Sequence, residues 1–206
     1  MRVYAESNFV LELVLEQEQH QACEELVSLA AIDSLELVLP AFALLEPYQT
    51  IVRRRIEGKG LHDVLVKSAQ QLERTAWIAG DVPRLRDAAN LLLSAEQEAA
   101  NRFLAVRTKL LAVARVIAID GATLRDASTL ATQFDLALPD AIMLASVLTD
   151  AAQQAPSIFV NRNTKDFDDP DLKARLKQVG CDLVWKFEDG LARVKSALAK
   201  APATPR

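Results

Sequence analysis

The sequence predicts an α/β protein in which a central parallel β-sheet is covered by helices on both faces. Short apolar segments that suit buried strands occur at residues 2–5, 35–39, 116–119, 157–160 and 182–185. Segments with helical periodicity separate these strands, and such alternation is typical of parallel sheets with right-handed crossovers. The chain has 206 residues, 50% of them hydrophobic and 25% charged, which is enough for a well-packed core. We therefore expect a three-layer α/β/α architecture in a single domain over residues 1–200.

Helices are expected after each of the first two strands. Apolar residues at helical spacing predict a helical hairpin over residues 8–16 and 18–31. After the second strand, Pro40 suits the first turn of a helix, where its missing N–H costs nothing. Pro47 should kink this helix, because it removes a backbone hydrogen bond. We expect the helix to end at residues 53–55, before two glycines.

The middle of the chain predicts a helical insertion at about residues 59–115. It contains one expected helix at 61–79, a turn at 80–83 and a long helix at 84–114, with almost no strand signal. This segment is too long for one crossover helix. We interpret it as an insertion that packs on the same core rather than as a separate domain.

The last third of the chain predicts three further helices and a disordered tail. Helices are expected at residues 123–134, from Leu138 onward, and at 188–200. Pro139 again fits the first helical position. Residues 201–206 include two prolines and no packing signal, which predicts disorder.

Composition excludes several classes of protein. No apolar run reaches the roughly 18 residues of a membrane span and no signal peptide is visible, so we expect a cytoplasmic protein without a membrane partner. Cys23 and Cys181 are isolated, which fits a reducing compartment and a role as small core residues. With only His20 and His62, a Ser-His-Asp triad has few candidates and a His-rich zinc site has none. The glycines form neither a GxGxxG motif nor a P-loop, so the plausible reactive groups are carboxylates.

Polar residues gather where the predicted strands end. Glu6 follows the first strand, Glu46 lies in the helix after the second, Asp140 opens a later helix, and Asn163 and Asp166 follow the fourth strand. The carboxyl ends of parallel strands share one edge of the sheet, where open α/β sheets bind ligands. We therefore expect these five side chains to converge.

Each of these residues also has a purely structural interpretation. Ser7 or Asn8 could cap the first helix, and an acid in the first turn of a helix, such as Asp140, is favoured by the helix dipole. Glu46 could be a solvated helix residue. Asp166 could cap the turn before Pro170, and Asn163 could be a turn residue with positive φ. The constellation is harder to dismiss, because all the candidates fall at the same edge.

The motifs resemble those of the PIN-domain family of metal-dependent ribonucleases. The matching segments are Val-Tyr-Ala-Glu-Ser-Asn at residues 3–8, Glu46, Leu-Pro-Asp-Ala-Ile at 138–142, and Asn-Arg-Asn-Thr-Lys-Asp-Phe at 161–167. The resemblance covers about residues 1–58 and 116–190, and residues 59–115 make this chain longer than compact toxin-type members. Two positions depart from the family pattern: Glu6 stands where Asp is usual, and Asn163 stands where an acid is common.

The resemblance implies a Rossmann-like PIN fold and an endoribonuclease that depends on Mg²⁺ or Mn²⁺, the cations that hard oxygen ligands favour. It implies that Glu6, Glu46 and Asp140 hold the metal, directly or through water, with Asp166 as a fourth ligand or a base for water. Asn8 would orient the first carboxylate, and Asn163 and Arg162 would orient the substrate. An antitoxin protein is an expected partner if the chain is a toxin of a toxin–antitoxin pair, and the apolar helices are compatible with a homodimer.

The charge of the chain is divided in a way that fits a polyanion. Residues 52–115 hold 12 Lys and Arg against 7 Asp and Glu, although the whole chain has a net charge of −4. Weak candidates for contacts with the RNA backbone are Arg53, Arg54, Arg55, Arg84 and Arg86. Exposed arginines on a helix are also compatible with ordinary solvated surfaces.

Two alternative functions remain open from the sequence. In the first, Glu6 and Asn163 mark a weakened catalytic site, and the chain is a PIN-fold scaffold that binds RNA or protein. In the second, the chain is a carboxylate-metal phosphatase for small phosphoesters. The phosphatase alternative lacks an obvious nucleophilic aspartate motif and leaves the basic insertion without a purpose.

Overall fold

The computed structural model describes residues 1–153 and 156–200. In these residues five strands form one parallel sheet in the order β3-β2-β1-β4-β5. The strands are β1 (Arg2–Ala5), β2 (Glu36–Pro40), β3 (Arg115–Ile117), β4 (Ser157–Val160) and β5 (Cys181–Val184). The α/β class and the parallel sheet are therefore confirmed, and each strand lies within two residues of its predicted position.

Strand β1 lies at the centre of the sheet. Its residue Val3 is in register with Leu37 of β2 on one side and with Ile158 of β4 on the other. All four β1 residues are buried. Burial on both faces explains why the strands are continuous apolar runs rather than alternating patterns.

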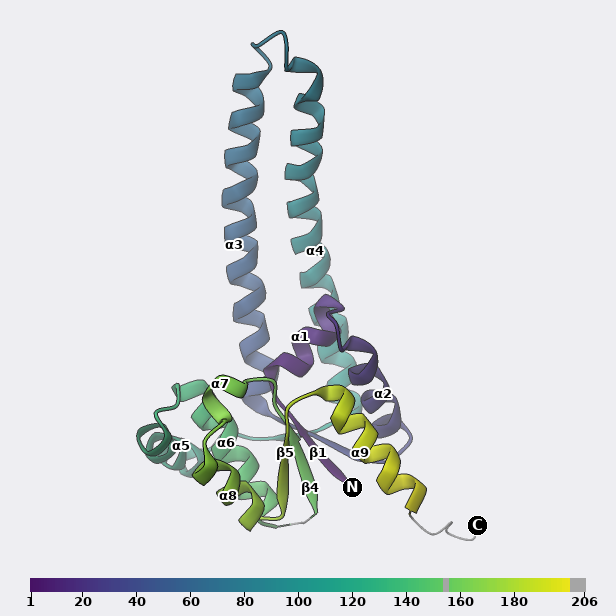
Figure 1. The fold of residues 1–206 in the computed structure, drawn as a ribbon, viewed down its shortest axis with the longest axis vertical. Helices are drawn as coiled ribbons and strands as arrows, with labels where there is room; N and C mark the ends of the chain where they lie inside the picture. The colour runs from purple at the N-terminus through teal and green to yellow at the C-terminus, as the bar shows by residue number, and fades with distance from the viewer. Residues whose placement is uncertain (154–155, 201–206) are drawn as a thin grey trace. The chain divides into compact units, whose positions relative to one another are not determined.

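Helices cover both faces of the sheet (Figure 1). They are α1 (Ser7–Leu15), α2 (His20–Ala31), α5 (Gly121–Phe134), α6 (Leu138–Ala151), α7 (Thr164–Phe167), α8 (Pro170–Gln178) and α9 (Phe187–Lys200). Side chains of Tyr4, Val38 and Phe159 share a buried core with residues of α5, α6 and α8. The opposite face is covered by α2 and α9, where Gly190 permits close contact, because a Cβ there would lie 2.8 Å from a methyl carbon of Val160.

Helices α7 and α8 were not expected from the sequence. The sequence does contain a signal for α8, the pair Asp169-Pro170. In the structure Asp169 accepts hydrogen bonds from the backbone N–H groups of Asp171 and Leu172, and Pro170 occupies the first helical turn. A capping acid followed by proline is a common helix start.

The chain divides into two compact units. We call residues 1–47 with the described part of 106–206 the sheet unit, and residues 48–105 the hairpin unit. Helices α3 (Ala41–Leu72) and α4 (Val82–Val113) supply the hairpin unit, joined through the 3₁₀ turn η1 (Ala79–Asp81). The prediction of a single domain over 1–200 concerns how the units are joined and stays a prediction. The expected disorder of 201–206 lies outside the described residues.

The expected end of a helix at residues 53–55, and a new helix at 61, were wrong. Helix α3 is continuous through Pro47 to Leu72. Gly58 lies inside this helix, and a Cβ there would lie 3.2 Å from Cγ of Glu96 in α4. A small residue at this position lets the two helices of the hairpin approach closely.

The hairpin unit is held by a seam of residues on α4 at alternating spacings of three and four. Val82, Leu85, Ala89, Leu92, Glu96, Ala99 and Phe103 are buried or half-buried while most of their neighbours are exposed. The ring of Phe103 lies 5.9 Å from that of Tyr48 on α3. This spacing is typical of paired helices that pack like a coiled coil.

Within the described residues, no single helix is both long and apolar enough to cross a membrane. Helices α5 and α6 meet that test only as a pair bent by 116°. Helix α6 belongs to the core of the sheet unit, where all of its residues from Ala141 to Leu148 are buried.

Candidate functional site

The four predicted acids lie at the carboxyl end of the sheet, within the sheet unit. Glu6 directly follows β1, Glu46 lies in the first turns of α3 after β2, Asp140 is in the first turn of α6, and Asp166 is in α7 after β4. We call these four residues the acidic cluster. They come from four separate segments of the chain, so only the parallel topology can bring them to one edge.

Glu6 is buried, with a relative exposure of 6%. Its Oε2 accepts a hydrogen bond from the backbone N–H of Asn8 at 2.8 Å, and its Oε1 accepts one from the backbone N–H of Arg162 at 3.2 Å. Burial raises the pKa of Glu6 to about 7, the charge of Glu46 adds to the shift, and the bonds from Asn8 and Arg162 oppose it. Glu6 itself caps α1, so the alternative in which Ser7 or Asn8 caps this helix was wrong.

Glu46 is half-buried and makes a hydrogen bond with a residue that sequence reasoning had considered only as a cap. Ser7 donates its hydroxyl to Oε2 of Glu46, which links the start of α1 to α3. The interpretation of Glu46 as a solvated helix residue was therefore wrong. The charge of Glu46 raises the pKa of both Glu6 and Asp140, so the three carboxyls are close enough to repel one another.

Asn163 links the other two acids. Its side-chain N–H₂ donates to Oδ1 of Asp140 at 3.2 Å and to Oδ2 of Asp166 at 2.8 Å. Burial raises the pKa of Asp140, and the charges of Glu46 and Asp166 raise it further, against the hydrogen bond from Asn163. The φ of Asn163 is −77°, so the interpretation of a turn residue with positive φ was wrong.

Sequence reasoning missed Glu12, which is fully buried in α1. Glu12 forms an ion pair with Arg162 and accepts a hydrogen bond from the backbone N–H of Gln19 at 2.8 Å. Its position among apolar residues of α1 was the available signal. The guanidinium of Arg162 is thus directed to Glu12, and Arg162 contacts the acidic cluster through its backbone N–H rather than through its side chain.

Among the described residues, no lysine or arginine neutralises the acidic cluster. In the part of the chain that the structure describes, none of its four members forms an ion pair with Lys or Arg, and no group of three or more His, Cys, Asp or Glu is placed to hold a metal ion. Clustered carboxylates with raised pKa values favour a divalent cation by charge and by donor chemistry. The cluster therefore fits a hard cation in its chemistry and does not present a ready-made coordination shell.

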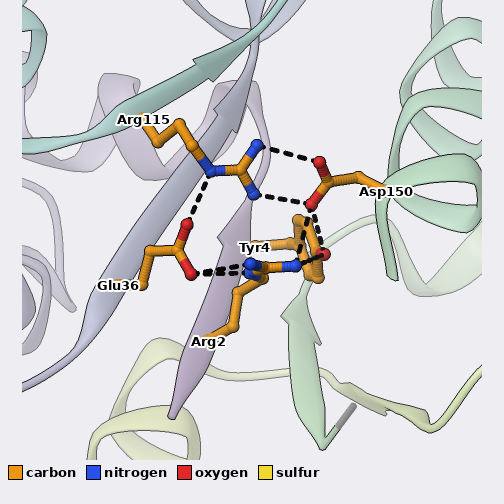
Figure 2. Close-up of polar contacts among 5 residues, drawn as sticks. All are labelled: Arg2, Tyr4, Glu36, Arg115 and Asp150. Atoms are coloured by element: carbon orange, nitrogen blue, oxygen red, sulfur yellow. Dashed lines mark hydrogen bonds and ion pairs between the residues drawn. The ribbon is translucent and has the colours of Figure 1, made fainter. Parts of the chain in front are cut away.

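The amino end of the same sheet has a different group of charges (Figure 2). Arg115 donates to both oxygens of Asp150 at 2.8 and 2.6 Å and to Glu36 at 2.6 Å. Arg2 donates to Glu36 at 2.8 Å and to Asp150 at 3.1 Å, and the hydroxyl of Tyr4 donates to Asp150 at 2.6 Å. We call these five residues the amino-end network.

The amino-end network is balanced in charge. Burial alone would raise the pKa of Glu36 and of Asp150, but the hydrogen bonds and positive charges that the rest of the network supplies outweigh it together and hold both pKa values below their usual range. Hydrogen bonds to Asp150 and Glu36 in turn raise the pKa of Arg115. Two guanidinium groups thus face two carboxylates, which leaves no net charge for a ligand to neutralise.

The arginines predicted to contact RNA all lie in the hairpin unit. Arg84 pairs with Asp81 at 3.0 Å and Arg86 pairs with Glu73 at 2.6 Å, so acids of the hairpin unit neutralise part of their positive charge. Residues 53–55 are exposed on α3. Their role as backbone contacts stays a prediction.

The two cysteines are confirmed as core residues. Both Cys23 and Cys181 are buried and free, and burial raises the pKa of Cys181 to about 11. Neither has the lowered pKa of a reactive thiol.

Comparisons with protein-family models, with curated proteins and with solved structures found no match to this chain.

Proposed function

We propose that this chain is a metal-dependent phosphodiesterase, and more specifically an endoribonuclease of the PIN-like kind that uses Mg²⁺ or Mn²⁺. The observation that carries the proposal is the acidic cluster: four carboxylates from separate segments lie at the carboxyl end of a parallel sheet, and no Lys or Arg of the described residues pairs with them. Burial and mutual repulsion raise the pKa of Glu6 and Asp140. An uncompensated cluster of this kind costs stability, which favours a functional role over a structural one.

The donor set favours Mg²⁺ or Mn²⁺ over softer metals because every available ligand is a hard oxygen. Mg²⁺ keeps several of its waters and is commonly held by one or two carboxylates, so a shell of three direct protein ligands is not required. Glu6, Glu46 and Asp140 are the proposed ligands, directly or through water. When bound, the cation supplies positive charge that polarises a phosphodiester and makes water more acidic.

The residues around the cluster have positioning roles in this proposal. The backbone N–H groups of Asn8 and Arg162 hold Glu6, and the hydroxyl of Ser7 holds Glu46. Asn163 fixes Asp140 and Asp166 relative to each other. Asp166 is half-buried and is the proposed base that takes a proton from the attacking water.

RNA is the proposed substrate because the motifs that carry the acidic cluster resemble those of PIN-domain ribonucleases. The same resemblance is the basis for proposing a cytoplasmic location, and a protein antitoxin as a partner if the chain is a toxin. A PIN-fold scaffold without catalysis is the main alternative, since Asn163 occupies a position where the family commonly has an acid. A phosphatase of small phosphoesters is the second alternative.

The test compares Asp140→Asn with Asp126→Asn, an exposed acid on α5 outside the cluster. Cleavage of single-stranded RNA in Mg²⁺ or Mn²⁺ should fall at least about 100-fold in Asp140→Asn, because a metal ligand is lost. Asp126→Asn should cleave like the wild type. Circular dichroism should report the same fold for both variants.

Three outcomes would contradict the proposal or select an alternative. Equal cleavage by Asp140→Asn and wild type would overturn the assigned site. No heat of Mg²⁺ or Mn²⁺ binding in calorimetry would favour the scaffold. Hydrolysis of a generic phosphomonoester, with intact RNA under the same conditions, would favour the phosphatase.

A further inference from the structure

A groove lies along the outer edge of β5, the terminal strand of the sheet. Its volume is about 330 Å³, and we call it the β5 groove. Its lining includes Lys173 and Lys177 of α8, Arg193 of α9, and Trp185, which directly follows β5. In the described residues this edge of β5 has no strand partner, so the groove is open along the strand.

The β5 groove is positively charged in a chain whose net charge is −4. It is lined by three cations and one carboxylate, Asp182. Lys173 pairs with Asp168, and Arg193 pairs with Asp182 at 3.3 Å, but both pairs are solvent-exposed and such pairs contribute little. Lys177 is exposed and forms no ion pair within the described residues. The cations of the groove can therefore bind a polyanion with only a small loss of free energy from the ion pairs that are broken.

The groove also contains an aromatic ring that can stack with a base. Trp185 is half-buried, and the ammonium of Lys173 lies 5.5 Å from the centre of its ring. This cation–π contact and the adjacent core restrict the ring's movement. An aromatic platform beside cations is the arrangement by which proteins bind single-stranded nucleic acid, with bases on the ring and phosphates on the cations.

The groove leads toward the acidic cluster. It extends from Cys181, at the start of β5, to Trp185 at the carboxyl end of the sheet. There β5 adjoins the segment after β4, since the backbone N–H of Asn161 donates to the carbonyl of Val184 at 2.9 Å. Asp168, the partner of Lys173, is two residues from Asp166 of the cluster. Both sites belong to the sheet unit.

We propose that the β5 groove binds single-stranded RNA and directs it to the acidic cluster. Lys173 moves from the ring of Trp185 to a phosphate, and a base takes its place on that face of the ring. Lys177 and Arg193 contact further phosphates. This inference rests on the proposed function, because it supplies the substrate path for cleavage at the cluster. It assigns the strand-binding surface to the sheet unit rather than to the arginines of the hairpin unit.

The first experiment measures binding without cleavage. The variant Trp77→Phe leaves Trp185 as the only tryptophan, and Trp77 is 83% exposed, so the fold should tolerate the change. An oligouridylate of about 12 nucleotides is titrated in EDTA while tryptophan emission is recorded. We expect quenching at saturation and affinity that falls as salt rises. Unchanged emission at a saturating concentration, verified by anisotropy of labelled RNA, would overturn the proposal.

The second experiment compares Lys177→Glu with a matched control, Lys195→Glu. Lys195 is an exposed residue of α9 that lies outside the groove and pairs with Glu25. Both variants change the charge by the same amount. Lys177→Glu should weaken RNA binding about tenfold and reduce the salt dependence, whereas Lys195→Glu should weaken it less than about twofold. Equal effects of the two variants would overturn the proposal.

Three further outcomes separate related explanations. An oligoglutamate of equal charge that quenches Trp185 as strongly as RNA would assign the groove to an acidic peptide added to the edge strand, and would overturn the RNA assignment. RNA binding that depends on Lys177, with no cleavage in Mg²⁺ or Mn²⁺, would support the groove and contradict the proposed nuclease. Cleavage that is equally fast in Lys177→Glu and Lys195→Glu would leave the nuclease intact and overturn the groove.

Discussion

Strand β1 and helix α6 each contribute to both ends of the sheet, and the charges at the two ends are organised differently. Strand β1 begins with Arg2 in the amino-end network and is followed by Glu6 of the acidic cluster. Helix α6 carries Asp140 in its first turn and Asp150 near its end. At one end the carboxylates face guanidinium groups (Figure 2), and at the other they face one another.

The pKa shifts have opposite signs at the two ends. At Asp150 burial is outweighed by the combined hydrogen bonds and charges of Arg115, Tyr4 and Arg2, which hold its pKa below the usual range, whereas burial raises the pKa of Asp140 and of Glu6. The amino-end network therefore stabilises the fold, whereas the acidic cluster costs stability. Sites that are destabilising in the free protein are common where function requires preorganised charge. This difference is the reason why we propose the carboxyl end, and not the amino end, as the functional site.

The largest effect is expected from Arg162→Met at the carboxyl end. This change leaves Glu12 buried without its partner, and an unpaired buried charge costs about 3–5 kcal/mol. Urea unfolding measures the loss. The double variant Glu12→Gln/Arg162→Met should recover most of it, because no charge is then buried. A double variant as unstable as Arg162→Met would show that the unpaired charge of Glu12 does not cause the loss of stability.

A smaller loss, about 2–3 kcal/mol, is expected from Asp150→Asn in the amino-end network. The substitution removes the carboxylate that accepts from Arg115, Arg2 and Tyr4. The matched control Asp126→Asn, on the exposed side of α5, should stay within about 0.5 kcal/mol of wild type.

The loss in Asp150→Asn should depend on pH. The pKa of Asp150 is lowered on folding, so its stabilisation is fully present above the unfolded value of about 3.9 and disappears as pH falls through the lower folded value. The difference between wild type and variant should therefore be constant from about pH 5 upward and shrink below about pH 4. A difference that persists unchanged at about pH 2 would contradict the ionic origin of the effect.

The smallest effect has the opposite sign and is expected from Glu6→Gln in the metal-free protein. Folding raises the pKa of Glu6 from 4.5 to about 7, so stability falls as pH rises through that window. A neutral side chain removes this penalty of about 3 kcal/mol but loses one of two hydrogen bonds. At about pH 8 in EDTA the variant should be about 1–2 kcal/mol more stable than wild type.

Saturating Mg²⁺ should reduce or reverse the advantage of Glu6→Gln, because a bound cation stabilises only the protein that binds it. Thermal unfolding with and without the metal measures the change. A Glu6→Gln variant that is less stable than wild type in EDTA would contradict the claim that the charge of Glu6 destabilises the carboxyl end of the sheet.

The sequence predicted the strands well because the signals for them are local. Apolar runs such as Val3–Ala5 and Ile158–Val160 are buried on both faces, so their identity is visible without knowledge of their neighbours. The continuous course of α3 was not predicted, because two glycines, Gly58 and Gly60, lie within it. Local propensity alone favoured a break there.

The sequence by itself determined which acids follow a strand, as Glu6 and Asp166 do, and which open a helix that leads back to one, as Asp140 does, and therefore that all three reach one edge of a parallel sheet. Only the tertiary structure decided which charges have partners. Arg162 reaches Glu12 across 150 positions in the chain, and Arg115 reaches Asp150 across 35. Burial and ion pairing arise from contacts between distant segments, so the contrast between a neutralised amino end and an unneutralised carboxyl end is a property of the fold.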